Sequence, residues 1–356
     1  MTSPNEGRRA MVVGTGLIGG SIGLALRGRG WHVSGADTDR DRAARARELG
    51  ALDVVGDDAE AEIVFLATPV SAVSGAAGPA LRSGAVVTDV GSVKAPIVDA
   101  IGHPRFVGGH PMAGSEQEGV DGADPSLFEG ATWVLTPTVE TDPQAYALVR
   151  GVVSSLGADV VALPPERHDA LVAIVSHVPH LTAATLMRLA AEGAEEHATV
   201  LRLAAGGFRD MTRIAAGHPG IWPDICAENR DAIVAALDQL LGALTEMRAL
   251  VDTGDRDGLL RQLERARAAR VNLPARVAAA EELTEIRVPV PDRPGVLAEV
   301  TTLASELDVN ILDLEIAHSA EGTRGVLVLV VDRRAADLVR GGLVARGFRP
   351  SLQPLE

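Results

Sequence analysis

A histidine that follows two glycines is the residue in this sequence best placed for acid–base chemistry. The apolar run 105–107 ends in Gly108 and Gly109, and His110 comes next, before a proline and a polar turn that contains Glu116. Glycines let a backbone approach a ligand closely, and a histidine exchanges a proton near neutral pH. A strand-ending turn without a function would show the same pattern. A cofactor motif before it and an anion-binding motif after it favour the functional interpretation.

A glycine-rich turn near the N-terminus predicts a dinucleotide site. It follows an apolar strand and opens an apolar helix, and its GxGxxG residues include Gly14, Gly16, Leu17, Ile18 and Gly19. The free N–H groups at such a helix start hold a pyrophosphate. Asp37 ends the next predicted strand, 23 residues after Gly14, where an acid accepts the ribose 2′-hydroxyl of NAD. Because a carboxylate there repels the 2′-phosphate of NADP, NAD is the predicted cofactor. Arg40 is near enough in the sequence to weaken this preference, and Asp37 could instead cap a helix.

Three further apolar runs each end in polar or glycine residues. They are 63–67 before Thr68 and Pro69, 85–90 before Gly91-Ser92-Val93-Lys94, and 105–107 before the glycines that precede His110. If the runs are parallel strands, their polar ends meet at the carboxyl edge of one sheet, where open α/β sheets bind ligands. We therefore expect Thr68, Pro69, Ser92 and Lys94 to border the cofactor. Ser92, Lys94 and His110 should face its nicotinamide end.

Residues 164–283 show helical periodicity and no convincing strand. Ser176 and His180 are four apart, so a regular helix would place both on one face. His177 and His180 have a spacing that also suits a metal, but no Cys or carboxylate ligand set accompanies them. We therefore expect no metal site there. Two buried structural histidines are the competing interpretation.

A second polar cluster follows at 206–213, GGFRDMTR. On a regular helix Arg209 and Arg213 share a face, and Asp210 is three residues from Arg213. An arginine fork suits a carboxylate, although a solvated helix face would look the same. Trp222 then opens another helix, either as a wall for a ring-shaped ligand or as part of the core.

The last part of the chain changes period again. Strands are predicted at 284–290, 310–318, 324–331 and 348–353, and helices at 296–307 and 335–346, which makes a βαββαβ unit. Its helix start is opened by Gly295 and offers free N–H groups to a carboxylate. Asp292 offers a partner for an ammonium group, and Asn310 stands at the start of a predicted strand.

Length and charge set the limits of these interpretations. The chain has 356 residues, enough for two or three domains, and we expect them at 1–163, 164–283 and 284–356. The net charge of −15 argues against a nucleic-acid partner. No uninterrupted apolar run approaches the roughly 20 residues that span a bilayer, and no secretory signal precedes the first strand. Cys226 is the single cysteine, which fits a reducing cytoplasm.

The motifs GTGLIGGSI, DVGSVK, GGHPMAGSE, SHVPH and GGFRDMTRIA occur in one order, and with them the chain resembles the TyrA family of prephenate dehydrogenases in tyrosine biosynthesis. The tail DRPGVLAEVTTLASELDVNI resembles an ACT regulatory domain. The resemblance implies an α/β protein with an N-terminal Rossmann-type dinucleotide-binding domain, an all-α dimerisation and substrate domain, and a C-terminal ACT-like domain. An Ala- and Leu-rich helical domain of this kind also suggests burial against a second copy, hence a homodimer.

The reaction that the resemblance implies is an oxidative decarboxylation. Prephenate loses a hydride to NAD, a proton from its hydroxyl and CO2, and 4-hydroxyphenylpyruvate remains. His110 matches the histidine that takes the hydroxyl proton, and Ser92 matches a serine that supports it. The other matching positions bind the substrate or line and gate its pocket: His180, Arg213, Ser176, Glu116, Asp210 and Trp222. Arg209 stands where the family often has lysine, with no expected change in chemistry.

Three alternatives stay open. Arogenate, with an amino group in place of the keto group of prephenate, is the first, and some relatives of this kind accept both. A 3-hydroxyacid-type dehydrogenase shares the glycine turn and helical domain but leaves GGHP and TRIA unexplained. A non-catalytic sensor of NAD and an amino acid would not need His110. For the tail we expect tyrosine as a feedback ligand near Asp292, Gly295 and Asn310, against a tail that only holds dimers together.

Overall fold

The computed structural model describes residues 5–354 apart from 6, 116, 118, 197–203, 273–282, 292 and 319–323. Two predicted site residues, Glu116 and Asp292, lie outside the described residues. The chain divides into two compact units, Met1–Gly254 and Asp255–Glu356. The predicted division into three domains stays a prediction.

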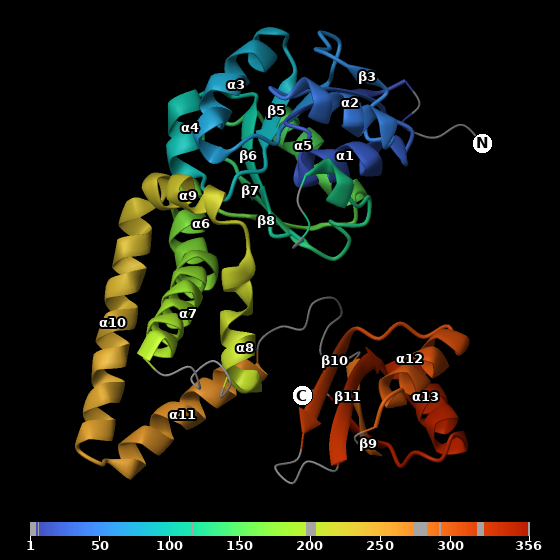
Figure 1. Cartoon of the computed structure of the whole chain (residues 1–356). Coiled ribbons are helices and arrows are strands. Elements are labelled where there is room, and N and C mark those ends of the chain that lie inside the picture. The colour runs from blue at the N-terminus through green and yellow to red at the C-terminus, as the bar shows by residue number, and fades with distance from the viewer. Residues whose placement is uncertain are drawn as a thin grey trace. The chain divides into compact units, whose positions relative to one another are not determined.

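An eight-stranded sheet forms the centre of the first unit, in the order β3-β2-β1-β4-β5-β6-β7-β8 (Figure 1). Its strands are β1 (Arg9–Val13), β2 (His32–Ala36), β3 (Val54–Val55), β4 (Ile63–Leu66), β5 (Val86–Asp89), β6 (Phe106–Pro111), β7 (Thr132–Thr136) and β8 (Asp159–Ala162). The first six are parallel to one another. This order, 3-2-1-4-5-6, is that of a doubly wound dinucleotide-binding sheet.

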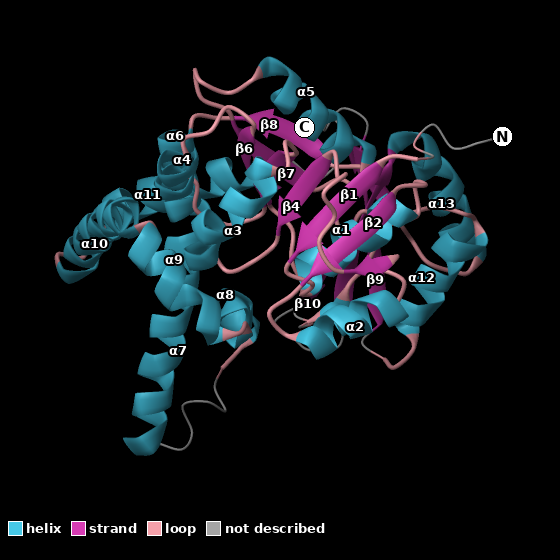
Figure 2. Cartoon of the chain, turned by 90° about the horizontal axis from the view of Figure 1, so that it is seen from above, coloured by secondary structure: helices cyan, strands magenta, loops and turns pink. Residues whose placement is uncertain are grey.

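Helices cover both faces of this sheet (Figures 1 and 2). Successive residues of β1 show why, because Ala10 and Val12 belong to one apolar cluster and Met11 belongs to another, as the alternation of side chains along a strand requires. The first cluster includes residues of α1 (Leu17–Arg27), α2 (Arg40–Glu48) and α5 (Pro143–Ser155). The second includes residues of α3 (Val70–Arg82) and α4 (Ala95–Ile101). A sheet covered in this way exposes its strand ends for ligands.

Two details of the strands near His110 differ from the prediction. The glycines and His110 are predicted to follow their strand, whereas β6 continues through Pro111. Its first half pairs with β5 in parallel and its second half pairs with β7 antiparallel, with His110 opposite Val134. β8 was not predicted, because it is short and mostly exposed at the edge of the sheet, so it lacks the apolar run of a central strand.

The rest of the first unit is helical, as predicted. It contains α6 (Pro165–Val172), the π-helix η2 (Ala173–His177), α7 (Val178–Glu196), α8 (Gly206–Thr212), the 3₁₀ turns η4 (Arg213–Ala216) and η5 (Pro219–Ile221), α9 (Trp222–Glu228) and α10 (Arg230–Asp252). A small apolar core joins α7, α9 and α10 to Val93, which lies in the loop after β5. The helical region is therefore attached at the carboxyl edge of the sheet.

Two predicted geometries in this region are wrong. Ser176 and His180 do not lie on one regular helix, because the π-helix ends at His177 and adds a residue to the turn. Arg209 and Arg213 do not share a regular α-helical face either, because α8 ends at Thr212 and Arg213 begins the 3₁₀ turn η4.

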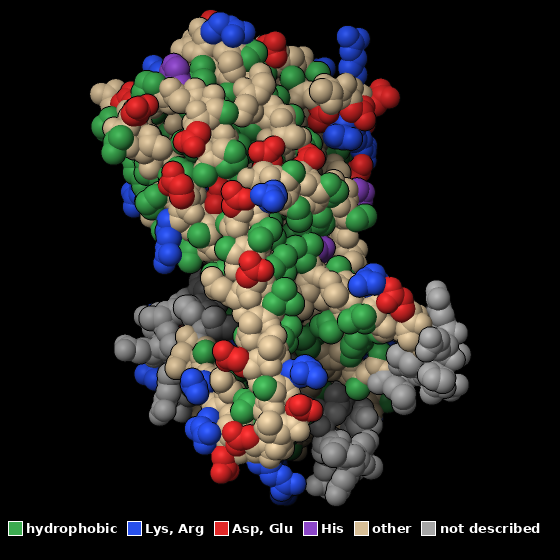
Figure 3. Space-filling model, turned by 90° about the vertical axis from the view of Figure 1, so that its left-hand side faces the viewer, with side chains coloured by type: hydrophobic (Ala, Val, Ile, Leu, Met, Phe, Trp, Pro, Cys, Tyr) green, Lys and Arg blue, Asp and Glu red, His purple; other side chains and the backbone are tan. Residues whose placement is uncertain are grey.

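Several helices of this region keep apolar side chains at the surface. The stretch Pro165–Gly193 is long and apolar enough to cross a membrane by length and composition, with a mean hydropathy of 1.5 and 28% of its most apolar window buried. It is not an uninterrupted apolar run, because Ser176, His177 and His180 lie within it. Its polar side chains nevertheless contact the sheet region, as described below. Further exposed apolar residues lie on α10: Val234, Leu241, Leu244 and Val251. Figure 3 views the molecule from the side on which α10 lies in Figure 1, and apolar side chains gather along the middle of that view. Apolar surface of this extent is typical of a contact with another chain or membrane.

The second unit contains α11 (Arg256–Val271) and a four-stranded antiparallel sheet in the order β10-β11-β9-β12. The strands are β9 (Leu283–Pro291), β10 (Asp313–His318), β11 (Arg324–Asp332) and β12 (Ser351–Pro354), and the helices between them are α12 (Val296–Glu306) and α13 (Arg333–Ala345). Both helices pack on one face of the sheet in a single core. The predicted βαββαβ order is therefore present.

Candidate active site

The glycine turn after β1 is shaped to receive a phosphate group. Gly14 has a φ of +91°, and a Cβ there would lie 2.4 Å from the carbonyl oxygen of Ala67. A Cβ on Gly19 would lie 1.9 Å from the carbonyl oxygen of Gly14, so these two glycines permit the turn and its packing. Gly16, the N-cap of α1, has no atom within 4 Å of such a Cβ. The open space at this helix start fits the pyrophosphate of a dinucleotide.

Asp37 stands at the end of β2, next to this turn. Its carboxylate accepts hydrogen bonds from the Thr15 amide at 2.8 Å, the Thr15 hydroxyl at 3.1 Å and the Asp39 amide at 2.9 Å. Burial would raise the pKa of Asp37, but these hydrogen bonds and Arg42 outweigh it and lower the pKa. The carboxylate is thus ionised where a ribose is expected. The arginine beside it is Arg42, at 3.6 Å, rather than the predicted Arg40.

His110 is buried at the carboxyl end of β6, with 9% of its surface exposed. Its Nδ1 lies 2.8 Å from Nε2 of His168, and Nδ1 of His168 lies 2.7 Å from Oδ1 of Asp169. Burial lowers the pKa of His110 well below its usual value, and electrostatic interactions with His168, Lys94 and His177 lower it further. The ring is therefore neutral at physiological pH and suited to accept a proton.

A buried ion pair supports the same strand end. Lys94 and Asp89 are both fully buried, and the ammonium of Lys94 binds the carboxylate of Asp89. Asp89 also accepts hydrogen bonds from the amides of Gly91 at 2.8 Å and Gly109 at 3.0 Å. Burial lowers the pKa of Lys94, against the effect of Asp89. Lys94 was predicted to border the cofactor. Its side chain is instead fully buried with Asp89, next to His110.

The helical region contributes a stack of rings. His180 and Trp222 are stacked, with ring centroids 3.7 Å apart and planes 14° apart, and His177 meets Trp222 edge-on at 6.1 Å. His177 Nδ1 lies 3.2 Å from the amide nitrogen of Asn229, while its Nε2 is buried without a hydrogen-bond partner among the described residues. Burial lowers the pKa of His177 to about 4 and also lowers that of His180. Both rings are therefore neutral near pH 7.

The remaining predicted residues have less defined surroundings. Ser92 is half-buried in the loop between β5 and α4, and Ser176 is half-buried in η2. Thr68 lies at the end of β4, and its hydroxyl is buried and unpartnered within the described part of the chain, while Pro69 is the exposed N-cap of α3. Arg213 and Asp210 are exposed.

The sequence analysis missed three residues of this network: His168, Asp169 and Asn229. His168 and Asp169 begin the helical region, where they look like polar residues on an ordinary helix. Both are buried, and Asn229 donates a hydrogen bond of 3.0 Å to the carbonyl oxygen of Asp169. The only sequence signal for His168 and Asp169 is that these two polar residues directly precede an apolar run. Among the described residues no cluster of three or more His, Cys, Asp or Glu side chains could hold a metal.

A glycine turn on a doubly wound sheet, with a neutral buried histidine at the same sheet edge, defines a nicotinamide-dependent oxidoreductase. Two domain families match the chain: the nucleotide-binding domain of prephenate dehydrogenase over residues 22–162 and its dimerization domain over residues 164–265. The chain therefore belongs to the prephenate dehydrogenase family, and the predicted family and NAD-dependent enzyme class are confirmed.

Individual relatives agree with this assignment. The prephenate dehydrogenase of Bacillus subtilis (strain 168) is 36% identical over 334 residues, which are 89% of this chain and 90% of that protein. The cyclohexadienyl dehydrogenase of Zymomonas mobilis is 33% identical over 74% of this chain and 94% of its own. The structure of A. aeolicus prephenate dehydrogenase with hydroxyphenyl propionate and NAD+ has a TM-score of 0.70 at 30% identity, and covers 75% of this chain and 98% of its own. Synechocystis arogenate dehydrogenase has a TM-score of 0.65 at 32% identity, with coverages of 74% and 98%.

Proposed function

We propose that the protein catalyses the NAD-dependent oxidative decarboxylation of prephenate to 4-hydroxyphenylpyruvate and CO2. The observation that carries this proposal is the buried, neutral His110 at the sheet edge that also bears the glycine turn. The substrate must lose its hydroxyl proton as a hydride leaves the same carbon, and a positioned base assists that loss. When bound, NAD accepts the hydride.

His110 is the proposed general base. Its Nδ1 is occupied by His168, so Nε2 is the nitrogen left to take the proton. Because the pKa of His110 is lowered, the ring is unprotonated before the reaction. Ser92 is proposed to support His110 from the neighbouring loop, while Thr68 and Pro69 border the cofactor at the end of β4.

Arg213 and His180 are the proposed substrate-binding residues. η4 packs against α7, and a Cβ on Gly217, just after η4, would lie 3.9 Å from Cε1 of His180. An arginine on this turn can bind a carboxylate through paired hydrogen bonds, and the stack on Trp222 fixes the plane of the His180 ring. The remaining residues proposed to line or gate the pocket are Ser176, Asp210, Glu116 and Trp222.

The test is to follow NADH absorbance with purified protein, NAD and prephenate. We expect turnover that falls at least about 10²-fold in His110→Asn, the scale of general-base catalysis, while NAD binding is kept. The matched control is His103→Gln, because His103 is exposed and precedes β6 at the opposite end of that strand. Absence of turnover, or near-normal turnover of His110→Asn, would contradict the proposal.

Arogenate is the alternative substrate. Its support is the similarity to Synechocystis arogenate dehydrogenase and to a cyclohexadienyl dehydrogenase. The same assay with arogenate decides between them: kcat/KM higher for arogenate would replace prephenate as the substrate, and comparable values would indicate a dual enzyme.

We further propose a cytoplasmic homodimer with the domains 1–163, 164–283 and 284–356. The exposed apolar side chains of α10 support the dimer, since an apolar face of this extent needs cover. The matching family is itself named a dimerization domain. Sedimentation of the protein and of a Leu241→Asp, Leu244→Asp variant is the test, and a wild-type monomer would contradict it.

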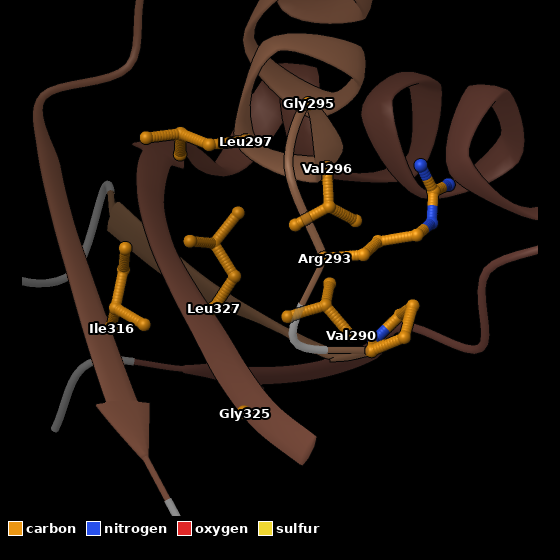
Figure 4. A pocket seen from close by; sticks show the side chains of 9 residues that line it. Val290, Arg293, Gly295, Val296, Leu297, Ile316, Gly325 and Leu327 are labelled. Atoms are coloured by element: carbon orange, nitrogen blue, oxygen red, sulfur yellow. The ribbon is translucent and has the colours of Figure 1, made fainter. Parts of the chain in front are cut away.

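The βαββαβ unit is proposed to be an ACT-like regulatory domain that binds tyrosine. Supporting this, a cavity of about 170 Å³ lies at the start of α12 (Figure 4), and its lining includes Gly295, Arg293, Leu297, Ile316 and Leu327. The apolar side chains suit an aromatic ring, and the free N–H groups after Gly295 suit a carboxylate. Among the described residues, Asn310 lines a different surface pocket, with Asp308 and Thr301.

Inhibition by tyrosine tests this regulatory proposal. The full chain should be inhibited, with a coupling of roughly 1–3 kcal/mol between the sites. Leu297→Glu, which places a charge at the cavity, should weaken inhibition without changing turnover in the absence of tyrosine. If that variant and a chain cut after Leu283 remain active and equally inhibited, tyrosine acts at the active site and the tail has another role, such as holding dimers together.

A further inference from the structure

The ring of His110 is the end of a linear chain of three buried side chains. His168 is 0% and Asp169 is 5% exposed. The chain runs from Nδ1 of His110 to Nε2 of His168 over 2.8 Å, and from Nδ1 of His168 to Oδ1 of Asp169 over 2.7 Å. Both distances are those of hydrogen bonds. Of these three residues, only His110 was among the predicted site residues.

The proton positions along this chain follow from its last member. A carboxylate only accepts hydrogen bonds, so the Nδ1 of His168 must donate to Asp169. Nε2 of a neutral His168 is then an acceptor, so Nδ1 of His110 must carry a proton and donate to it. A neutral His110 with its proton on Nδ1 has a lone pair on Nε2. That is the tautomer a general base needs if it acts through Nε2.

Asp169 is itself held in place from two directions. Its Oδ1 accepts a hydrogen bond from the Lys94 amide and its Oδ2 accepts one from the Ala95 amide, both 2.8 Å long, at the start of α4. Its backbone carbonyl accepts a hydrogen bond from Asn229 of the helical region. The carboxylate therefore has a fixed orientation relative to both the sheet edge and the helices.

We propose that His168 and Asp169 are the positioning pair of the catalytic histidine, which fix the proton of His110 on Nδ1 and stabilise its charge after Nε2 accepts the substrate proton. In this step the O–H bond of the substrate breaks, an N–H bond forms at Nε2 of His110, and the positive charge stays on the His110 ring, where the hydrogen bond from Nδ1–H to His168, itself bound to Asp169, stabilises it. The catalytic part of the inference rests on the proposed role of His110.

Several charged or titratable groups surround His110. They are His168 and Asp169 from α6, Lys94 and Asp89 from the β5–α4 segment, and His177 from η2. His168, Lys94 and His177 all lower the pKa of His110 after burial has done so. The hydrogen bond that Nδ1–H of His110 donates to His168 acts in the opposite direction, because it is stronger when the His110 ring is charged. The measurements that isolate the pair are therefore kcat, KM and the position of the proton on His110.

Two substitutions of His168 separate hydrogen bonding from charge. In His168→Gln the side-chain oxygen can still accept from Nδ1 of His110, but it cannot carry a proton charge. In His168→Leu the acceptor is lost. We expect kcat to fall about tenfold in the first and at least about 10²-fold in the second, with KM within about threefold. His103→Gln serves again as the matched control.

Asp169→Asn tests the tautomer directly. The amide can donate to Nδ1 of His168, which reverses both hydrogen bonds and moves the proton of His110 to Nε2, so kcat should fall by about 10²–10⁴-fold. Thermal unfolding and NAD binding establish that each variant folds. Equal kcat in wild type and in all three folded variants would overturn the proposal.

The tautomer can also be measured without turnover. Nitrogen-15 NMR of the protein with labelled histidines, nine in the chain, gives the protonated nitrogen of each ring, and His110→Asn identifies the signal of His110. We expect protonated Nδ1 in the wild type and protonated Nε2 in Asp169→Asn. Protonated Nε2 in the wild type would overturn the positioning pair. Failure of the enzyme to use prephenate would count against the proposed function alone.

Discussion

Acidification is expected to destabilise the Met1–Gly254 unit through His177. This ring is 1% exposed. Burial lowers its pKa from 6.5 to about 4, with Asp169 opposing and His168 adding to the shift. A histidine whose pKa is lower in the folded state binds its proton more readily after unfolding. Its contribution to stability is therefore complete above about pH 6.5 and is lost as the pH falls toward 4.

The size of the effect follows from the two pKa values. Between pH 7.5 and pH 5, an unfolded-state pKa of 6.5 and a folded-state pKa of about 4 reduce the free energy of unfolding by roughly 2 kcal/mol. The lowered pKa of His110 adds an effect of the same sign. A variant that changes only His177 is therefore needed to isolate its share.

His177→Asn is that variant. Its side-chain oxygen can accept the hydrogen bond that the Asn229 amide offers to Nδ1 of His177, but it does not titrate. Urea unfolding followed by tryptophan fluorescence reports on the first unit alone, because the three tryptophans of the chain all lie within it. Loss of the His177 ring lowers the free energy of unfolding at both pH 7.5 and pH 5. Only the change in that free energy between the two pH values isolates the titration of His177.

The expected result is a pH-dependent loss of stability that is smaller in His177→Asn than in the wild type by about 2 kcal/mol. Identical losses in the two proteins would refute the reasoning. They would mean that His177 titrates in the folded protein near its ordinary pKa, and hence that its ring is hydrated.

Three further predictions concern ligand binding. Gly16→Ala should leave thermal stability unchanged, because its Cβ meets no protein atom, yet weaken NAD binding at least about tenfold by calorimetry. Gly14→Ala should instead lower the free energy of unfolding by at least about 1–2 kcal/mol, because the φ of Gly14 is positive and its Cβ would lie too close to Ala67. Equal stability of the two variants would contradict the role given to the turn. Arg213→Ala should raise KM for the substrate at least about tenfold in steady-state assays, and an unchanged KM would remove it from the site. Asp37→Ser should narrow the ratio of kcat/KM for NAD over NADP, and a constant ratio would show that Asp37 does not contact the ribose.

The parts of the fold that were predictable have local signals. A glycine turn between an apolar strand and an apolar helix specifies the start of a doubly wound sheet, since the turn needs glycine at a positive φ such as that of Gly14. The βαββαβ order was likewise predictable, from changes in the spacing of apolar residues along the sequence. By contrast, β6 extends through His110 because β7 pairs with it, and such long-range pairing leaves no trace in the local sequence.

The site was predictable where a residue type carries the chemistry. His110 stands out because histidine, glycine and proline adjoin. His168 and Asp169 do not, because their role depends on burial and on hydrogen bonds to distant residues. The π-helix before His180 likewise changed the direction of side chains that a regular helical spacing had placed on one face.

The burial of Lys94 has a practical consequence for chemical labelling. Lys94 is the only lysine in the sequence, and its ammonium is fully enclosed with Asp89. Amine-reactive reagents therefore meet only the α-amino group of the folded chain, and cross-linkers that join lysines will not report its neighbours. A second label enters only when the segment between β5 and α4 opens. The rate of that second modification, measured by mass spectrometry, is thus a residue-specific measure of how often this segment next to His110 opens.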